Sequence, residues 1–396
     1  MTSRGNPRHI WRLAFAITAC ATVFTIMQGL TYPLLALILN RMDVPEWLIG
    51  INAATMPVGM IVSAPLAPRL MRRFGGRDLT VASLITSAAC LLAIGATQDA
   101  WLWMPLRLLT GIALGCILVV NESWINQIAS DNHRGRIIGF YSAVLSAGFA
   151  LGPALLAIVG SRGWAPFLIG AALPLLALLP LLAVRGSLPT LPAGERTVPV
   201  LAFLRMAPLL LVLTAAVALA DEGAMSFLPI YALAHGYGEQ TGTILLIVMI
   251  AGSVSLQYPI GWVADRVPRT MVMIACSAAA ALSAAAMPFT VTTPWLFAFA
   301  VFLWGGVYYA IYMLALVRLG ESFAGMTLVT GNAAFAAMWG VGGIAGSSVV
   351  GGAMSAFGPV GFPLVFVVTF GAIAIAIAAL AVRERKRTTS MPEHRG

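Results

Sequence analysis

Long apolar runs alternate with short polar segments along almost the whole chain. Each run is long enough for a helix to cross a bilayer, which takes about 20 apolar residues. The pattern therefore predicts an all-α integral membrane protein with twelve transmembrane helices. The first six runs cover 13–39, 46–68, 79–98, 101–128, 137–160 and 164–184, and the last six cover 207–234, 241–264, 270–291, 294–317, 325–355 and 360–382.

A polar stretch separates the two sets of runs. It is rich in proline and charged residues, a composition typical of linkers. We therefore expect two six-helix bundles joined by a connecting segment. The predicted boundaries are 1–184 for the N-terminal bundle, 185–206 for a cytoplasmic linker, 207–383 for the C-terminal bundle and 384–396 for a cytoplasmic tail.

The composition agrees with a membrane protein and argues against a nucleic-acid-binding one. The chain is 60% apolar and 9% charged, whereas soluble domains have about 25% charged residues. The net charge of +9 comes from small arginine clusters between apolar runs, and no basic stripe is interleaved with exposed aromatics. The four cysteines have no metal or redox spacing. We expect buried free thiols, no metal and no cofactor.

The positions of the basic residues predict how the chain is oriented. If the N-terminus is cytoplasmic, twenty of the 23 Lys and Arg residues lie in cytoplasmic loops and tails, as the positive-inside rule requires. Arg41 and Arg162 fall outside, and Arg107 falls within a span. The first run continues past Cys20 and is longer than a signal-peptide core of about 7–15 residues. We therefore expect an uncleaved first span, both termini in the cytoplasm and residence in the cell inner membrane.

A short motif follows the eighth apolar run. Gly261, Asp265, Arg266 and Arg269 are spaced Gly-x-x-x-Asp-Arg-x-x-Arg at the point where a helix leaves hydrocarbon. Gly261 would let a neighbouring helix approach closely. The motif resembles the cytoplasmic loop signature of the major facilitator superfamily, which assigns these four residues to a gate. In the first half, the corresponding segment ends at Arg69, but a proline precedes it where the signature has aspartate.

The resemblance implies parallel six-helix halves related by a pseudo-twofold axis, with the substrate bound between them at mid-membrane. Arg107 resembles the superfamily's fourth-helix arginine, which is associated with proton coupling. A lone arginine in hydrocarbon costs about 2.5–3.5 kcal/mol on insertion scales. The alternative is a structural arginine that binds carbonyls of the first helix. Gly111 and Gly115 follow it at four-residue spacing and predict close helix packing.

A second glycine motif lies in the fifth span. Gly148, Gly152 and Pro153 form a G-x-x-x-G-P pattern, which predicts a close-packed, bendable helix. The pattern resembles the fifth-helix signature of the drug/proton antiporter branch of the superfamily. We assign these three residues to gating.

Asp221 and Glu222 are the strongest candidates for proton coupling. They are adjacent within the seventh span, where burial and mutual repulsion favour exchange of protons near neutral pH. Neighbouring helix positions point about 100° apart, so the two carboxylates cannot face a cavity equally. The alternative is that one of them pairs with Arg107 or caps a bend near Gly223.

Glu122 lies fifteen residues after Arg107, about 22 Å along a helix. It is therefore too far away to pair with Arg107, and we expect a gate residue that pairs with Arg69 or Arg134. The sequence around it, Asn-Glu-Ser-Trp followed by Arg-Gly-Arg, resembles a bacterial subgroup of the superfamily typified by YcaD.

Aromatic and polar residues within spans are candidates for the substrate cavity. An aromatic stripe with nearby amides suits a small, flat, amphipathic solute. The alternative interpretation of the stripe is a packed helix interface. The candidate residues are Gln28, Tyr32, Trp304, Tyr308, Tyr312 and Asn332.

The sequence contains no hydrolase triad, phosphate loop or nucleotide-binding domain, so we do not expect an enzyme or an ATP-driven pump. The hypothesis is a secondary transporter that couples a small molecule to protons in the lipid bilayer by alternating access, as a monomer. The best concrete guess is import of a vitamin such as riboflavin. The alternatives are proton-antiport efflux of drugs or metabolites and a non-transporting receptor.

Overall fold

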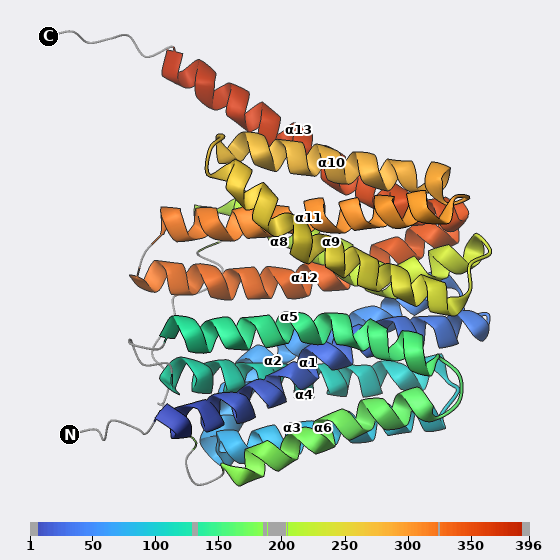
Figure 1. Cartoon of the computed structure of the whole chain (residues 1–396), viewed down its shortest axis with the longest axis vertical. Coiled ribbons are helices and arrows are strands. Elements are labelled where there is room, and N and C mark those ends of the chain that lie inside the picture. The colour runs from blue at the N-terminus through green and yellow to red at the C-terminus, as the bar shows by residue number, and fades with distance from the viewer. Residues whose placement is uncertain are drawn as a thin grey trace, which may run out of the picture. The chain divides into compact units, whose positions relative to one another are not determined.

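The computed structural model describes residues 7–128, 134–184, 188, 203, 205–323 and 325–389. Across these residues the chain is all helical, as predicted, with twelve α-helices and no strand (Figure 1). The helices are α1 (Pro7–Arg41), α2 (Glu46–Phe74), α3 (Gly76–Ala96), α4 (Ala100–Ile128), α5 (Arg134–Val159), α6 (Ala165–Ala183), α8 (Pro208–Ala234), α9 (Glu239–Ala264), α10 (Arg269–Thr290), α11 (Pro294–Ser322), α12 (Gly325–Phe357) and α13 (Gly361–Thr389).

Eleven stretches of the described residues are long and apolar enough to cross a membrane. The last of them, Thr330–Val382, has 53 residues and takes in most of both α12 and α13. As one straight helix it would measure about 80 Å, far more than the hydrocarbon core of about 30 Å. The short 3₁₀ turn Gly358–Val360 separates the two helices, and Gly358 has a φ of +66°. The chain is thus a multi-pass membrane protein.

The chain forms two compact units that do not follow the order of the sequence. Unit 1 comprises residues 1–197, 222–246 and 343–351, and unit 2 comprises the remainder. Helices α8 and α12 therefore contribute segments to both units, and α8 passes from one to the other between Asp221 and Glu222. The predicted division into bundles 1–184 and 207–383 remains a prediction. Most of the predicted linker, and the tail beyond Thr389, lie outside the described residues.

In unit 1, α4 packs against α2 and α3, and α1 packs against α4, α5 and α6. Gly111 of α4 lies directly on the backbone of Met56, so a side chain there would clash. Gly152 of α5 lies in the same way on Gly29 of α1, where an added Cβ would come within 2.6 Å of the Gly29 Cα. The predicted close packing at both glycine motifs is confirmed. Such contacts are how membrane helices approach one another without a hydrophobic driving force.

Unit 2 is built around α10 and α11. Helix α10 packs against both α11 and α13, and the backbone of α9 approaches α11 where Gly252 lies against Phe302. Bulky aromatic side chains fill the interior. Those fully buried in this unit include Phe203, Phe297, Trp304, Tyr308, Phe362, Phe366 and Phe370.

Hydroxyl groups within the spans bind the backbone of their own helices. Thr214 donates to Leu210 O at 2.9 Å, and Ser277 donates to Met273 O at 2.8 Å. Such bonds satisfy the hydroxyl where no water is present. The four cysteines are buried free thiols, as predicted. Polar residues that instead bind side chains of other helices therefore stand out, and they define the candidate site.

Candidate functional site

The first group of such residues surrounds Arg107 in α4 of unit 1. Its side chain is buried, and Nη1 donates to Asn52 Oδ1 of α2 at 3.2 Å. Asn52 in turn donates to Ala100 O at 2.8 Å, which fixes its amide. The guanidinium also lies 5.2 Å from the ring centroid of Tyr32 in α1. Arg107 is thus held by a side-chain amide and an aromatic face, and among the described residues it binds no carbonyl of α1.

Arg107 has unused hydrogen-bonding capacity. Its Nε and Nη2 atoms are buried and have no hydrogen-bond partner in the described part of the chain. Arg107, Thr31 and Thr110 line a cavity of about 10 Å³ together with apolar side chains, which is near the lower limit for one water molecule. An arginine so placed is costly unless another group balances its charge.

Glu222 of α8 supplies that charge in the same unit. Gln28 Nε2 donates to Glu222 Oε1 at 3.2 Å, and both side chains are buried. The charges of Glu222 and Arg107 act on each other and on Tyr32. We call the five residues Gln28, Tyr32, Asn52, Arg107 and Glu222 the polar cluster. Of the predicted alternatives for the adjacent acids, the structure brings Glu222, but through Gln28, into the vicinity of Arg107.

Asp221, the neighbouring residue, belongs to unit 2 and has a different partner. Tyr308 of α11 donates its hydroxyl to Asp221 Oδ1 at 2.8 Å. Asp221 is half-buried, whereas Glu222 is 4% exposed. The 100° step between adjacent helix positions directs the two carboxylates to separate surroundings. Each acid thus has its own donor.

The predicted aromatic stripe of α11 divides into two parts. Trp304 and Tyr308 are buried and pack on α13, with the Trp304 and Phe366 ring centroids 4.6 Å apart. Tyr312 is half-buried and contacts Trp339 of α12 at 5.1 Å. Tyr309 is also half-buried, 5.8 Å from Tyr312 and 6.3 Å from Trp339. We call Tyr309, Tyr312 and Trp339 the aromatic surface.

Sequence reasoning missed Trp339, although the glycine-rich run that begins at Gly340 could have drawn attention to it. Asn332, a predicted cavity residue, is exposed on α12. Tyr309 lies within electrostatic reach of Asp221, so unit 2 combines a carboxylate with three partly accessible rings.

The loop motif between α9 and α10 takes a local form. Arg266 donates to Trp262 O at 2.8 Å and lies 3.8 Å from the Trp262 ring centroid, whereas Arg269 forms an ion pair with Glu321. Asp265 is exposed. The expected close approach at Gly261 is wrong for this structure: among the described residues, an added Cβ would meet only Met313 Cε, at 3.9 Å.

The other predicted gate residues lie in unit 1. Arg69 is exposed near the end of α2, and Glu122 is exposed on α4, where its charge acts on Tyr141. The side chain of Arg134 lies outside the described residues, so the pairing of Glu122 with Arg69 or Arg134 stays a prediction. Gly148 lies against Thr25 of α1, and Pro153 Cδ would lie 2.9 Å from a Cβ added at Gly29.

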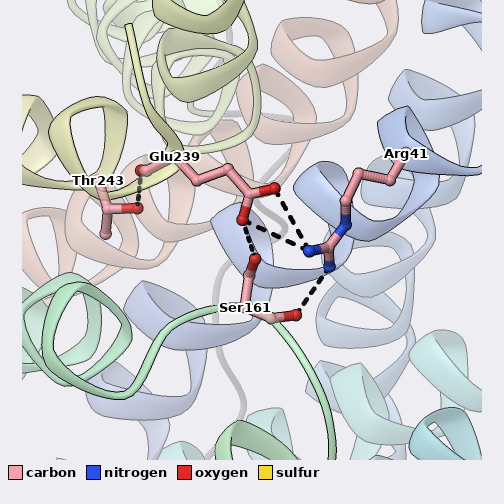
Figure 2. A network of polar contacts seen from close by, with 4 residues as sticks. All are labelled: Arg41, Ser161, Glu239 and Thr243. Atoms are coloured by element: carbon pink, nitrogen blue, oxygen red, sulfur yellow. Dashed lines mark hydrogen bonds and ion pairs between the residues drawn. The ribbon is translucent and has the colours of Figure 1, made fainter.

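A further polar network lies where α1 ends and α9 begins (Figure 2). Arg41 Nη1 lies 3.3 Å from Glu239 Oε1, and Arg41 Nη2 donates to Ser161 O at 2.8 Å. The Ser161 hydroxyl also donates to Glu239, whose own carbonyl accepts from Thr243. We call these four residues the outer network. The only sequence signal was that Arg41 is one of two basic residues expected outside.

Close backbone contacts lie near the outer network in unit 1. Gly50 of α2 lies against the backbone of Ser347 in α12, and Gly351 of α12 lies against Glu46 and Gly50. Gly343 continues this contact, because a Cβ there would lie 3.1 Å from Glu222 Cγ and 3.3 Å from Pro57 Cγ. The segment Gly343–Gly351 therefore seals the start of α2 and reaches the polar cluster.

The family model described as Major Facilitator Superfamily matches residues 13–330 of this chain. The chain belongs to the Major Facilitator Superfamily. It is therefore a membrane transporter of the secondary class and not an enzyme. The polar cluster, the aromatic surface and the outer network are features of a superfamily member and concern the passage of a small molecule.

Among the relatives in the superfamily, the uncharacterized transporter YcaD of Escherichia fergusonii is 25% identical over 330 residues, which cover 82% of this chain and 85% of YcaD. Among solved structures, the nucleoside transporter NupG has a TM-score of 0.75 at 14% identity, covering 93% of this chain and 98% of NupG. The D-xylose-proton symporter has a TM-score of 0.72 at 16% identity, covering 93% of this chain and 97% of the symporter. At these identities the two structures show the shared fold alone.

Proposed function

We propose that this transporter couples the movement of a small, flat, amphipathic solute to the movement of protons across the cell inner membrane, with both termini cytoplasmic. The observation that carries the proposal is the buried Glu222, hydrogen-bonded to Gln28 and in electrostatic contact with Arg107. In this assignment Glu222 exchanges the proton, and Arg107 responds to its charge.

The argument rests on the cost of buried charge. While Glu222 is ionised, the polar cluster holds one negative and one positive group and is neutral as a whole. When Glu222 is protonated, Arg107 keeps only Asn52 and the Tyr32 ring as neutral partners. A buried charge without a counter-charge is unfavourable by several kcal/mol, roughly. Protonation of Glu222 thus favours a different arrangement of α4 and α8, which is the differential stability that coupling requires.

The solute is assigned to unit 2. The aromatic surface offers three rings on which a flat solute can stack, and Asp221 with the Tyr308 hydroxyl offers a hydrogen-bonding edge. The exposed amide of Asn332 adds a donor and an acceptor on α12. Riboflavin, taken up as a vitamin, is one solute of this chemistry, and it serves as the first ligand to test.

A second candidate function is proton-antiport efflux of a cationic drug or metabolite. It is favoured by the position of Asp221 beside aromatic rings, because carboxylates and aromatic faces together attract organic cations. The direction of transport separates the two candidates, since inside-out vesicles accumulate an exported solute and right-side-out vesicles accumulate an imported one.

The outer network supplies a gate in this scheme. Arg41, Ser161 and Glu239 come from three segments far apart in the sequence, and the predicted orientation puts all three on the external side. We assign to them the closure of the external end of unit 1. Opening that end would separate Arg41 from Glu239.

The test uses purified full-length protein in proteoliposomes with an imposed pH gradient. Wild type should accumulate labelled solute above equilibrium. Glu222→Gln should abolish this accumulation, by more than tenfold, while exchange of labelled for unlabelled solute at equal pH continues. Asp43→Asn is the matched control, because Asp43 is an exposed carboxylate with a φ of +54°, which asparagine tolerates.

Normal accumulation by Glu222→Gln would overturn the assignment of the proton site. Loss of both accumulation and exchange in Glu222→Gln, with unchanged thermal stability, would mean that Glu222 binds the solute. If no solute moves in wild type but riboflavin and organic cations both bind, the protein is the receptor that the sequence left as an alternative.

A further inference from the structure

A groove lies on the surface of unit 1 between the start of α1 and the end of α6. Its volume is about 360 Å³, within the range of roughly 300–1,000 Å³ for sites that hold small molecules. It belongs to neither the polar cluster nor the outer network. Its walls are Trp11, Arg12 and Phe15 from α1, Pro180 and Ala183 from α6, and Val184 directly after α6.

The groove is mostly apolar and faces outwards. Phe15 is 60% exposed and Trp11 is 39% exposed. On a multi-pass membrane protein, exposed apolar side chains of a spanning helix face lipid. Behind the groove, Val184 packs with the buried Leu13 and Ala16, so the floor is closed. The surface is therefore suited to an acyl chain.

Arg12 places a positive charge at one end of this apolar surface. The apolar run of α1 begins at Leu13, so Arg12 lies where hydrocarbon gives way to water. Trp11, beside it, contacts the Phe140 ring of α5 at 5.9 Å, and tryptophan is enriched at this depth of the membrane. No carboxylate of the described residues lies within ion-pair distance of Arg12.

An unpaired interfacial cation above an apolar slot is complementary to one class of molecule. A phospholipid carries a phosphate at the interface and acyl chains below it. A basic residue near the membrane surface favours anionic over neutral lipid, and a zwitterionic lipid carries its own ammonium group, which competes for the phosphate. We propose that the groove is a binding site for an anionic phospholipid, whose phosphate pairs with Arg12 and whose acyl chain lies on Phe15, Pro180 and Val184.

Native mass spectrometry of the full-length protein tests the site directly. The protein is titrated with phosphatidylglycerol, with phosphatidylethanolamine and with free glycerol phosphate. Wild type should retain phosphatidylglycerol in preference to phosphatidylethanolamine, and free glycerol phosphate should not displace it. Arg12→Gln should weaken retention of phosphatidylglycerol by about fivefold, the ratio expected for one basic residue at an anionic surface.

Two further variants separate the groove from simple charge. Ala183→Phe fills the groove from its exposed wall while leaving Arg12 in place, and it should weaken retention at least as much as Arg12→Gln. Arg162→Gln is the matched control, because Arg162 is an exposed arginine two residues from the exposed Trp164 but does not line the groove. A photoreactive phosphatidylglycerol should crosslink to peptides that contain residues 11–15 and 180–184.

Several outcomes would overturn the proposal. Equal retention of the two lipids would show that the groove does not select charge. An equal loss in Arg162→Gln would show that any interfacial arginine suffices, and displacement by free glycerol phosphate would show that the acyl chain contributes nothing. No lipid retained by wild type, with no change in Ala183→Phe, would mean that a segment of the chain itself fills the groove.

Discussion

The polar cluster of unit 1 and the aromatic surface of unit 2 surround two neighbouring carboxylates in different ways. Glu222 is buried, accepts a bond from an amide and shares its surroundings with an arginine. Asp221 is half-buried, accepts a bond from a phenol and lies near aromatic rings. Two residues of the same chemistry are thus directed to different tasks by their neighbours: charge balance for Glu222 and solute recognition for Asp221.

The largest effect should follow from breaking the polar cluster. Arg107→Gln removes the only cation of the cluster and leaves a buried Glu222 without a counter-charge. Loss of one member of a buried charged pair costs about 3–5 kcal/mol. We expect a lower melting temperature in detergent and no transport. The double variant Arg107→Gln/Glu222→Gln should recover much of the stability without transport. If Arg107→Gln melts and transports like wild type, the two charges are not coupled.

The next largest effect should come from the carboxylate of unit 2. Asp221→Asn removes a charged acceptor that contributes about 1.5–3 kcal/mol when hydrogen-bonded. We expect KM for the solute to rise by about tenfold, while the number of protons moved per solute stays the same. A proton-to-solute ratio that falls in Asp221→Asn, with KM unchanged, would exchange the roles of the two acids.

A smaller change should follow from removing only the donor to Asp221. Tyr308→Phe deletes the hydroxyl but keeps the ring that packs beside Trp304 and Phe370. A neutral hydrogen bond contributes about 1 kcal/mol, so KM should rise by about fivefold with coupling intact. Tyr258→Phe, at a position that is 82% exposed, is the control. Identical kinetics for Tyr308→Phe and wild type would mean that the hydroxyl does not shape the solute site.

The smallest effect should be at the outer network. The side chains of Arg41 and Glu239 are 28% and 24% exposed, and ion pairs of this kind contribute about 0–1 kcal/mol. Ser347 is buried against Gly50, so a Ser347→Cys reporter should react with an external maleimide only when that end opens. Adding Arg41→Gln should raise the labelling rate by up to about fivefold. A slower rate would show that Arg41 does not hold the end closed.

Much of the fold was accessible from the sequence, because it depends on local patterns. The length of each apolar run determines each helix, and the four-residue spacing of Gly111 and Gly115 or of Gly148 and Gly152 places both glycines on one helical face. The close contacts of these faces followed from that spacing. Gly261 has a comparable setting but no such contact, because a glycine permits close approach and does not by itself supply the partner helix.

The candidate site was less accessible, because its contacts join residues far apart in the chain. Glu222 and Gln28 are separated by 194 positions, and Asp221 and Tyr308 by 87. Helical geometry predicted that the two acids point in different directions. It could not say which acid meets which donor. The outer network was missed for the same reason, since Arg41, Ser161 and Glu239 share no local motif.

The most direct test of the central claim is the proton flux that accompanies solute transport, measured with a pH-sensitive dye inside proteoliposomes. The account predicts that wild type and Asp221→Asn move protons in proportion to solute, whereas Glu222→Gln moves solute down its gradient with no proton signal. Solute-dependent proton flux in Glu222→Gln equal to that of wild type would contradict the assignment of Glu222 as the residue that links the two movements.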